Sequence, residues 1–501
     1  MSGMAAKIWQ RLVHIDRKEM TLMFALLLLV LGQNSWNPGF HPDGYIYAGV
    51  AENASKSLEN AIVSKFTPNN YPIFHMHPPL VTAINGALLR IVPHSWTGHR
   101  LIQVLWAMAT ALVLYGLLMS GKDPRYREWG FWSVVLLALC PHFIKLSRYP
   151  NLDIPLTFFI CLSLLFQFLA ISKDRPRDWV FSGLFFGLAL LSKGPQAVVV
   201  LINAGFFLIS TKQLKKLLSP WPWIGLLVGG LVFSLWPLAL ASMGKLEVFW
   251  AYIDVQILPT VVNSRGKADL DFFGYFRHIL KTSPHICLLA IFALIPSKRL
   301  LKNPIGLFLL SWCLAVLIPF SFMRWKYSHY IASVYPALVG IAGYGLSRFD
   351  LARQLWLRKG LTRLMYIAGF ALLLLPITKG PKRDPELLKA LEVYRQLPHL
   401  PEQIIVLDHV IGEYNIKNLF GMRVGKDIDY ESYSVLGKDG FSKLLLGKQT
   451  MTFLSSDRWV ELSDQLGESY QVLYYFPRLN TTLIIHRELL DLGLIFSRLG
   501  P

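Results

Sequence analysis

Charged residues are scarce in this chain, and the scarcity excludes an ordinary soluble domain. Asp, Glu, Lys and Arg make up 16% of the 501 residues, whereas 53% are hydrophobic. Soluble globular chains carry about 25% charged residues. The apolar residues stand in continuous blocks, such as "LIQVLWAMATALVLYGLLM" at 101–119, rather than at amphipathic spacing. Because a bilayer core about 30 Å thick needs about 20 apolar residues per helix, the sequence predicts a polytopic membrane protein.

Cysteines, repeats and processing signals are equally sparse. The four cysteines, at positions 140, 161, 287 and 313, all lie in apolar segments, so no disulfide framework is implied. The first apolar run follows "KIWQRLVHIDRKE" and has no small-residue cleavage site after it. This pattern predicts a retained anchor rather than a cleaved signal. No internal repeat or low-complexity stretch is found.

The apolar blocks predict about eleven transmembrane helices by the usual length criterion. These lie at 20–35, 98–120, 129–147, 154–171, 179–192, 195–210, 221–243, 285–296, 304–321, 329–346 and 364–378. With residues 1–19 in the cytoplasm, every short connection predicted inside holds at least three basic residues. The net charge of +19 is therefore interpreted as loop charge that sets membrane orientation, not as a nucleic-acid footprint. An apolar stretch at 77–93 is short and bounded by prolines, and it predicts a helix lying along the outer surface.

The composition changes after residue 378, where a polar tail begins. Residues 20–378 are predicted to form the transmembrane domain, with outer loops at 36–97 and 244–284. Within 379–501, the segments 403–409, 448–456 and 470–476 predict strands, and 458–466 predicts a helix. Pro477 and Asn480 fall near the turn of a predicted hairpin. The tail is therefore expected to be a small α/β domain outside the cytoplasm.

This topology collects the unusual polar side chains at the outer membrane–water boundary. They are Asp43, His75, His77, Arg148, Asp153, Lys193, Arg265, Arg324, Lys326, His329 and Tyr330. Two acids and several cations gathered at one face indicate a polar site there, because ionisable groups at membrane depth are costly unless they have a function or a partner.

Lys193 is the most informative of these residues. The apolar runs on either side are only about 21 to 24 Å long as helices, so the turn between them is expected at or below headgroup depth. A cation there requires an anion, which could come from the protein, a lipid headgroup or a substrate phosphate. The alternative is that Lys193 extends its ammonium group to the surface. Phosphate binding is favoured because Gly194 and Pro195 turn the backbone tightly.

Ordinary structural roles compete with functional ones at several positions. Asp43 could be a loop acid or helix cap, and Asp153, which precedes an apolar span, could be an N-cap. Arg324 is best explained as an interface anchor. His75 and His77 have metal-like spacing, but Pro78 follows and no Cys or Glu completes a zinc set.

The two acids lie in segments that resemble loop motifs of a known group. This group is the GT-C glycosyltransferases that include aminoarabinose lipid A transferases and protein O-mannosyltransferases. "HPDGYIYAGVA" resembles their first outer-loop motif, usually PDE followed by YA, with Asp43 on the catalytic acid. "RYPNLDIPLTFF" resembles their YxxLDP motif, with Asp153 on its acid. The resemblance covers roughly residues 20 to 350 and implies a donor sugar on a polyprenyl phosphate.

The predicted cationic residues lie in four more segments that resemble this group, in the same order. "FHMHPPL" resembles the FEKP segment, with His77 at the Lys position, and "LLSKGPQ" resembles the TKG turn, with Lys193 on the phosphate-binding lysine. "FWAYIDVQILPTVVNSRGK" resembles the FWxYF…R loop, with Arg265 on its arginine. "MRWKYSHYIASVYPAL" resembles the KLPxY segment, with Lys326 and Tyr330 on its lysine and tyrosine.

Two departures from the family pattern affect what the resemblance implies. Gly44 replaces the second acid of the PDE motif, so no metal ligands are assigned, although a divalent cation is compatible with the family. His77 stands in place of Lys, so any phosphate binding at that point depends on pH. The tail resembles no segment of this group, and the acceptor does not carry over.

The resemblance implies an inverting transfer to an acceptor hydroxyl. Asp43 would act as general base, and Asp153 would orient the acceptor or steady a cation. The leaving polyprenyl phosphate would be stabilised by fixed charges, supplied by Lys193, Arg265, Lys326 and His77 together with Tyr330. The acceptor would be lipid A, an envelope glycan or a protein, at the outer face of a bacterial inner membrane.

Two other interpretations remain open from the sequence. A transporter or lipid flippase would also need intramembrane ionisable residues, although transporters place them near the midplane on broken helices of two related halves. A structural subunit that has kept this fold and lost activity is the second, and Gly44 favours it. The sugar, the metal dependence and the oligomeric state are not determined by the sequence.

Overall fold

The structure, a computed structural model, divides the chain into two compact units. The helical unit comprises Met1–Trp36, Ala61–Val63 and His75–Gly380, and the sheet unit comprises Asn37–Asn60, Ser64–Phe74 and Pro381–Pro501. The described residues are 17–33, 35–68, 70–120, 125–261, 271–294, 298–324, 326–348, 356, 359–360, 363, 367, 385–397, 399–401, 403–407, 413–424, 428–431, 433–446, 448–477 and 480–490.

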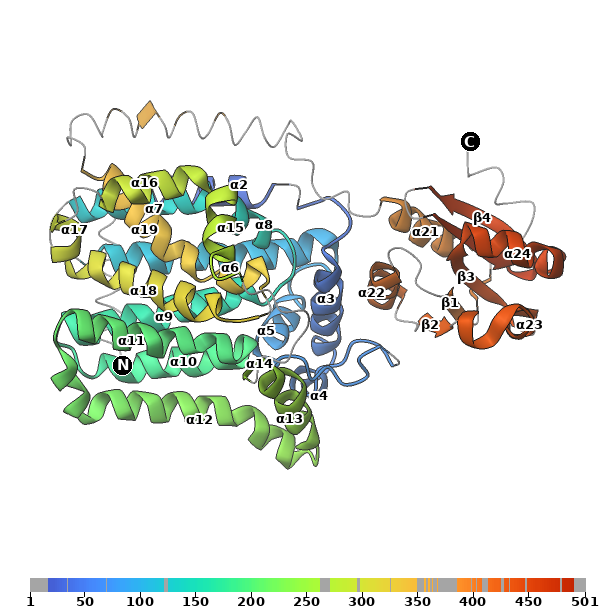
Figure 1. The fold of residues 1–501 in the computed structure, drawn as a ribbon, viewed down its shortest axis with the longest axis horizontal. Helices are drawn as coiled ribbons and strands as arrows, with labels where there is room; N and C mark the ends of the chain where they lie inside the picture. Colours follow the sequence, from blue (N-terminus) through green and yellow to red (C-terminus); the bar gives the residue numbers. More distant parts are fainter. Residues whose placement is uncertain are drawn as a thin grey trace. The chain divides into compact units, whose positions relative to one another are not determined.

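Helices make up the helical unit, and most of the long ones run side by side (Figure 1). The helices of its first half are α2 (Arg17–Leu31), α5 (Leu80–Leu88), α6 (Trp96–Leu118), α7 (Arg125–Ala138), α8 (Pro141–Leu146), α9 (Asp153–Ser172) and α10 (Asp178–Lys193). After the short η1 (Pro195–Val198) come α11 (Val199–Ser210), η2 (Leu214–Leu218), α12 (Pro220–Ser242), α13 (Glu247–Tyr252), the π-helix η3 (Ile253–Ile257) and α14 (Leu258–Val261). The last described group is α15 (Gly274–Thr282), α16 (Pro284–Leu294), α17 (Lys298–Lys302), α18 (Pro304–Ser321), η4 (Ser328–Ile331) and α19 (Val334–Leu346).

Four helices in the described part of the chain are long and apolar enough to cross a membrane, namely α6, α9, α12 and α18. Shorter apolar helices occupy Pro195–Ser210, Pro284–Leu294 and Val334–Leu346. A helical polytopic architecture is therefore supported, whereas the predicted count of eleven spans is not established. The span predicted at 364–378 falls largely outside the described residues. The predicted surface helix at 77–93 is present as the nine-residue α5, which is too short to span a bilayer.

The buried share of the apolar residues differs between helices of the bundle and distinguishes the central α9 from the outward-facing α12. In α9, 83% of the apolar window is buried, whereas in α12 the corresponding share is 22%. Seven large apolar side chains of α12 are exposed: Trp223, Ile224, Leu226, Leu227, Leu231, Leu235 and Leu238. An apolar surface of this kind is stable against lipid rather than water, so α12 presents it to the bilayer.

Paired glycines bring α10 and α12 together at the edge of the bundle. Gly183 and Gly187 on α10 stand four residues apart and meet Gly225 and Gly229 on α12. A Cβ atom at Gly229 would lie 2.9 Å from the backbone oxygen of Gly183 and 2.9 Å from a ring carbon of Phe186. Small residues at this spacing allow close helix packing in membranes, where van der Waals contact drives association.

Leucine at position 229 is expected to separate α10 from α12, and leucine at the neighbouring position 230 is not. A Cβ at Gly230 would have no heavy atom within 4 Å, so Gly230→Leu is a matched control on the same helix. Overpacking of a fitted contact costs about 1–3 kcal/mol, and thermal unfolding of the detergent-purified protein measures it. Equal unfolding temperatures for the two variants would contradict the close glycine contact between α10 and α12.

The sheet unit has a five-stranded mixed sheet with strand order β2-β1-β3-β5-β4. The strands are β1 (Gln403–Leu407), β2 (Ile428–Glu431), β3 (Thr450–Ser455), β4 (Tyr470–Phe476) and β5 (Thr481–His486). The helices of the tail are α21 (Pro385–Gln396), α22 (Glu413–Val424), α23 (Tyr433–Leu446) and α24 (Ser456–Leu466). The strands and helix predicted from the tail are confirmed, and the predicted hairpin is the antiparallel pair of β4 and β5.

Consecutive side chains are buried along β1, β3 and β5, so both faces of the sheet are covered. Phe453 of β3 packs its ring against Phe420 of α22, with centroids 5.6 Å apart. The next residue, Leu454, belongs to a cluster with Phe441 of α23 and Leu462 of α24. Because neighbouring strand residues point to opposite faces, α22 covers one face, and α23 and α24 cover the other.

The sheet unit also contains a segment far earlier in the chain. It includes α3 (Pro42–Ala54) and most of α4 (Leu58–Ile62), and α3 packs against α22. The sequence assigns 36–97 to an outer loop of the membrane domain, whereas the packing groups 37–60 and 64–74 with the tail. The domain boundaries proposed from composition alone stay a prediction.

Candidate functional site

An ion pair between Asp153 and Lys193 lies at the centre of the candidate site. Lys193 Nζ is 2.6 Å from Asp153 Oδ1, and the two side chains are only 5% and 6% exposed. Asp153 is the first residue of α9 and Lys193 the last of α10, so each charge also complements the dipole of its helix. The anion that Lys193 requires is thus a protein carboxylate, and its ammonium group does not extend to the surface.

Capping of α9 is performed by a different residue. Asn151 Oδ1 accepts hydrogen bonds from the backbone N–H groups of Asp153 and Ile154, at 3.0 and 3.2 Å. The carboxylate of Asp153 is therefore not needed as an N-cap, which was the competing interpretation of this acid. It faces Lys193 instead, and the electrostatic influence of His77 and His329 also reaches it.

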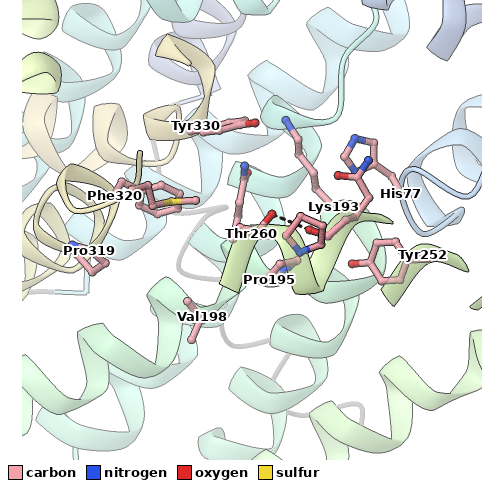
Figure 2. Close-up of a pocket in the computed structure, with 13 residues that line it drawn as sticks. His77, Lys193, Pro195, Val198, Tyr252, Thr260, Pro319, Phe320 and Tyr330 are labelled. Carbon is pink, nitrogen blue, oxygen red and sulfur yellow. Dashed lines mark hydrogen bonds between the residues drawn. The ribbon is translucent and has the colours of Figure 1, made fainter. Parts of the chain in front are cut away.

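Lys193 also lines a cavity of about 280 Å³ in the helical unit. Figure 2 shows Lys193, His77 and Tyr330 at this cavity, together with Tyr252, Thr260 and Phe320. The ammonium group lies 5.6 Å from the centre of the Tyr330 ring, within the range of a cation–π contact. Three of the predicted phosphate-binding residues, His77, Lys193 and Tyr330, are thus brought together from distant parts of the sequence.

Tyr252 is a lining residue that the sequence did not single out. It belongs to an aromatic cluster with Trp236 and Phe249, whose ring centroids lie 5.4 and 6.4 Å from its own. Its hydroxyl stands against Gly194, directly after Lys193. Gly194 has φ +84°, a backbone conformation that side chains with a Cβ rarely adopt. The turn after Lys193 therefore requires glycine for two independent reasons.

Alanine at position 194 is expected to disturb this turn. The Cβ of alanine would collide with the Tyr252 hydroxyl. The strained backbone conformation would destabilise the folded protein by about a further 1–3 kcal/mol. We expect Gly194→Ala to lower both the unfolding temperature and the activity of the purified protein. Gly205→Ala on α11 is the control, because a Cβ there has open space and no left-handed backbone. If both variants behave as wild type, the turn does not depend on glycine.

A π-helical segment forms part of the cavity wall. Residues Ile253–Ile257 form this segment, and Gln256 within it lines the cavity. Thr260 Oγ1 donates to the Gln256 carbonyl at 2.6 Å, and the Gln256 side-chain amide lies 3.2 Å from Met76 Sδ. Short π-helices are frequent at functional sites. The sequence motif "FWAYIDVQ" contains both Tyr252 and Gln256. The family resemblance of this segment, however, pointed to Arg265 as its functional residue.

Other sequence candidates do not line this cavity or lie outside the described residues. Lys326 Nζ donates to the Met323 carbonyl at 2.7 Å, and Lys326 is not among the lining residues. Arg148 donates to the Val30 carbonyl at 2.8 Å at the end of α2, which is a structural contact. Arg265 lies outside the described residues, and its predicted role stays a prediction.

Asp43 lies in the sheet unit, in the first turn of α3. Its side chain is 43% exposed, and Oδ2 is 3.8 Å from His41 Nδ1. Burial raises the pKa of the Tyr71 phenol, and the nearby carboxylate of Asp43 raises it further. Tyr71 is therefore held in its protonated form beside this acid. Within the described residues, no three His, Cys, Asp or Glu side chains are grouped so as to hold a metal ion.

Comparison with known proteins agrees with this architecture. A family model described as dolichyl-phosphate-mannose-protein mannosyltransferase matches residues 76–237, about a third of the chain. Two crystal structures of ArnT from Cupriavidus metallidurans share 15% sequence identity with it. The structure bound to undecaprenyl phosphate has a TM-score of 0.62, with 93% of this chain and 96% of that chain covered. The apo structure has a TM-score of 0.64, with 96% and 98% covered.

The chain therefore has the same fold as ArnT, and the resemblance inferred from the sequence motifs is confirmed at the level of the fold. Two uncharacterised proteins of Aquifex aeolicus (strain VF5) are also similar, with 24% identity over 338 residues and 27% over 302 residues. These matches cover 67% and 60% of this chain. They span 65% and 64% of the relatives' own lengths, just under two thirds of each.

Proposed function

We propose that this chain is a membrane glycosyltransferase that moves a sugar from a polyprenyl-phosphate carrier to an acceptor hydroxyl. The transfer takes place at the outer face of a bacterial inner membrane and inverts the anomeric centre. The acceptor is lipid A, another envelope glycan or a protein. The cavity that contains Lys193, His77 and Tyr330, in a chain with the GT-C fold, is the observation that carries this proposal.

The cavity suits the phosphate end of such a donor. Lys193 offers an ammonium group whose position is fixed by Asp153, and Tyr330 and His77 add polar groups beside it. Val198, Pro319 and Phe320 give the same cavity apolar walls, as a prenyl chain requires. In ArnT, the related fold binds undecaprenyl phosphate. A cation held in advance stabilises the negative charge that develops on a departing phosphate, without reorganisation during the reaction.

Two acids take different roles in this proposal. Asp43 accepts the proton of the acceptor hydroxyl while the oxygen attacks the anomeric carbon. The bond from that carbon to the phosphate oxygen breaks, and the lipid phosphate leaves with the electron pair. Asp153 does not contact the reacting atoms. It holds Lys193 in place, so it is a positioning residue. Arg265 and Lys326 are further cations proposed to act on the lipid phosphate.

Mass spectrometry of lipid A, other envelope glycans and surface proteins tests the proposal directly. Cells without this gene would be compared with the same cells carrying the wild-type chain. We expect one sugar-sized mass to disappear on deletion and to return with the wild-type chain, together with consumption of a polyprenyl-phosphate sugar in isolated membranes. If no glycan changes in either strain, a transporter or an inactive subunit with this fold becomes the better explanation.

A further inference from the structure

A second cavity of about 280 Å³ lies within the sheet unit, between α3, residues 65–68 with Pro72, and α22. We call it the α3–α22 pocket. Its lining includes both polar and apolar side chains. Its volume is close to that of small ligand sites, which begin at about 300 Å³, and it is large enough for one sugar ring with a phosphate.

The walls of the α3–α22 pocket are held by fitted packing rather than by loose surface loops. Phe66 is 5% exposed and lies between two glycines, Gly49 of α3 and Gly421 of α22. A Cβ at Gly421 would come within 3.1 Å of the Phe66 ring, and one at Gly49 would overlap it. The two glycines therefore make room for the Phe66 ring, which fixes the spacing between α3 and α22 at the pocket.

Charges at the α3–α22 pocket have a positive excess. Glu52 Oε1 lies 3.6 Å from Arg423 Nη1, and Lys65 Nζ lies 3.3 Å from Glu59 Oε1. Lys56 Nζ instead donates to the neutral Asn53 Oδ1 at 2.8 Å. Among the described residues that line the pocket, two lysines thus accompany one carboxylate, that of Glu52. The pair of Lys65 and Glu59 is solvent-exposed, and such pairs contribute little stability, so Lys65 can exchange its partner for an anionic ligand.

The α3–α22 pocket shares its helix with Asp43. Gly49, Glu52 and Asn53 of α3 line the pocket, and Lys56 follows two residues after the helix ends. At 1.5 Å per residue, these positions lie about 9 to 20 Å along the chain direction from Asp43. An acceptor of two or three sugar units has that length. One end can present its hydroxyl to Asp43 while the other end occupies the pocket.

We infer that the α3–α22 pocket binds a phosphate-bearing sugar unit of the acceptor, through Lys56 and Lys65, at a distance from the hydroxyl that is modified. The identification of the ligand as part of the acceptor rests on the proposed function. The binding of a sugar phosphate to this pocket does not depend on it. It also gives the tail a role in acceptor selection, since α22 supplies one wall. A neutral glycan would not need the positive excess.

Binding of glucose 1-phosphate to the detergent-purified full-length protein, measured by titration calorimetry, is the first test. Glucose is the uncharged comparison. We expect glucose 1-phosphate to bind the wild-type protein and the Lys56→Gln/Lys65→Gln variant to bind it at least about tenfold more weakly, as expected for the loss of two charge-assisted contacts. Lys438→Gln/Lys443→Gln is the matched control, since both lysines are exposed on α23 of the same unit. Both proteins should unfold at the wild-type temperature.

Three results would overturn the inference. The first is binding of glucose as tight as that of glucose 1-phosphate. The second is equal binding of glucose 1-phosphate by the two double variants, which would assign the binding to another site such as Lys193. Transfer to the native acceptor in membranes could also remain at the wild-type level in the Lys56→Gln/Lys65→Gln variant, which would remove the acceptor role. The calorimetric result needs no donor and no turnover, so a failure of the proposed glycosyltransferase function is seen separately, as an absence of transfer by the wild-type chain.

Discussion

Replacement of Asp43 by asparagine is expected to lower the rate of sugar transfer by about 10²- to 10⁴-fold, the usual contribution of a general base. The amide has nearly the same shape as the carboxylate but cannot accept the hydroxyl proton at neutral pH. Because the Asp43 side chain is 43% exposed at the first turn of α3, the variant should fold normally. Transfer in membranes and thermal unfolding of the purified protein measure the two expectations.

Asp457→Asn is the matched control for this experiment. Asp457 is also an exposed acid in the first turn of a helix of the sheet unit, here α24, so the two substitutions change helix capping electrostatics in the same way. We expect full transfer activity from the control. If Asp43→Asn and Asp457→Asn both retain wild-type transfer, the carboxylate at position 43 is not the base.

Removal of either partner of the Asp153–Lys193 pair is expected to have the largest effect on stability. Breaking a buried ion pair from one side leaves an uncompensated charge and costs about 3–5 kcal/mol. Asp153→Asn and Lys193→Gln should therefore each lower the unfolding temperature in detergent. The pair of Lys216 and Asp174, 3.0 Å apart, supplies the control, because the Asp174 side chain is 92% exposed and Asp174→Asn should change the unfolding temperature little.

The Asp153→Asn/Lys193→Gln double variant separates the structural from the functional role of Lys193. It replaces the ion pair with two neutral amides, which removes the buried charge, so most of the lost stability should return. Transfer should remain lost, because no cation is left to stabilise the departing phosphate. A double variant that recovers both stability and transfer would show that Lys193 serves the fold alone.

Much of the architecture could be predicted because it is encoded in local patterns. Apolar block length marked the helical segments of the bundle. The predicted span at 129–147, however, is divided between α7 and α8, and only four described helices meet the full spanning length. A strand-like segment at 470–476 and a turn signal near Pro477 and Asn480 marked the β4–β5 hairpin. The ordered motifs marked Asp153, Lys193, His77 and Tyr330, of which the last three line one cavity.

Long-range partners could not be predicted in the same way. Tyr252 and Gly194 are 58 positions apart in the sequence, and nothing local relates a tyrosine hydroxyl to a glycine with positive φ. The sequence allowed Asp153 to act as the N-cap of its helix, whereas in the structure Asn151 accepts the hydrogen bonds of the first N–H groups. Lys326 matched a motif position, but its ammonium group binds the Met323 carbonyl in the structure.

The sequence by itself determined the membrane character of this protein, the order of its helices, the α/β nature of its tail and the polar residues worth testing. These properties follow from hydrophobicity and periodicity along a few consecutive residues. Only the tertiary structure decided that Asp153 neutralises Lys193, that α3 belongs with the tail, and that Lys56 and Lys65 line a pocket with α22. Those outcomes depend on which distant surfaces pack together, and packing is a property of the whole folded chain.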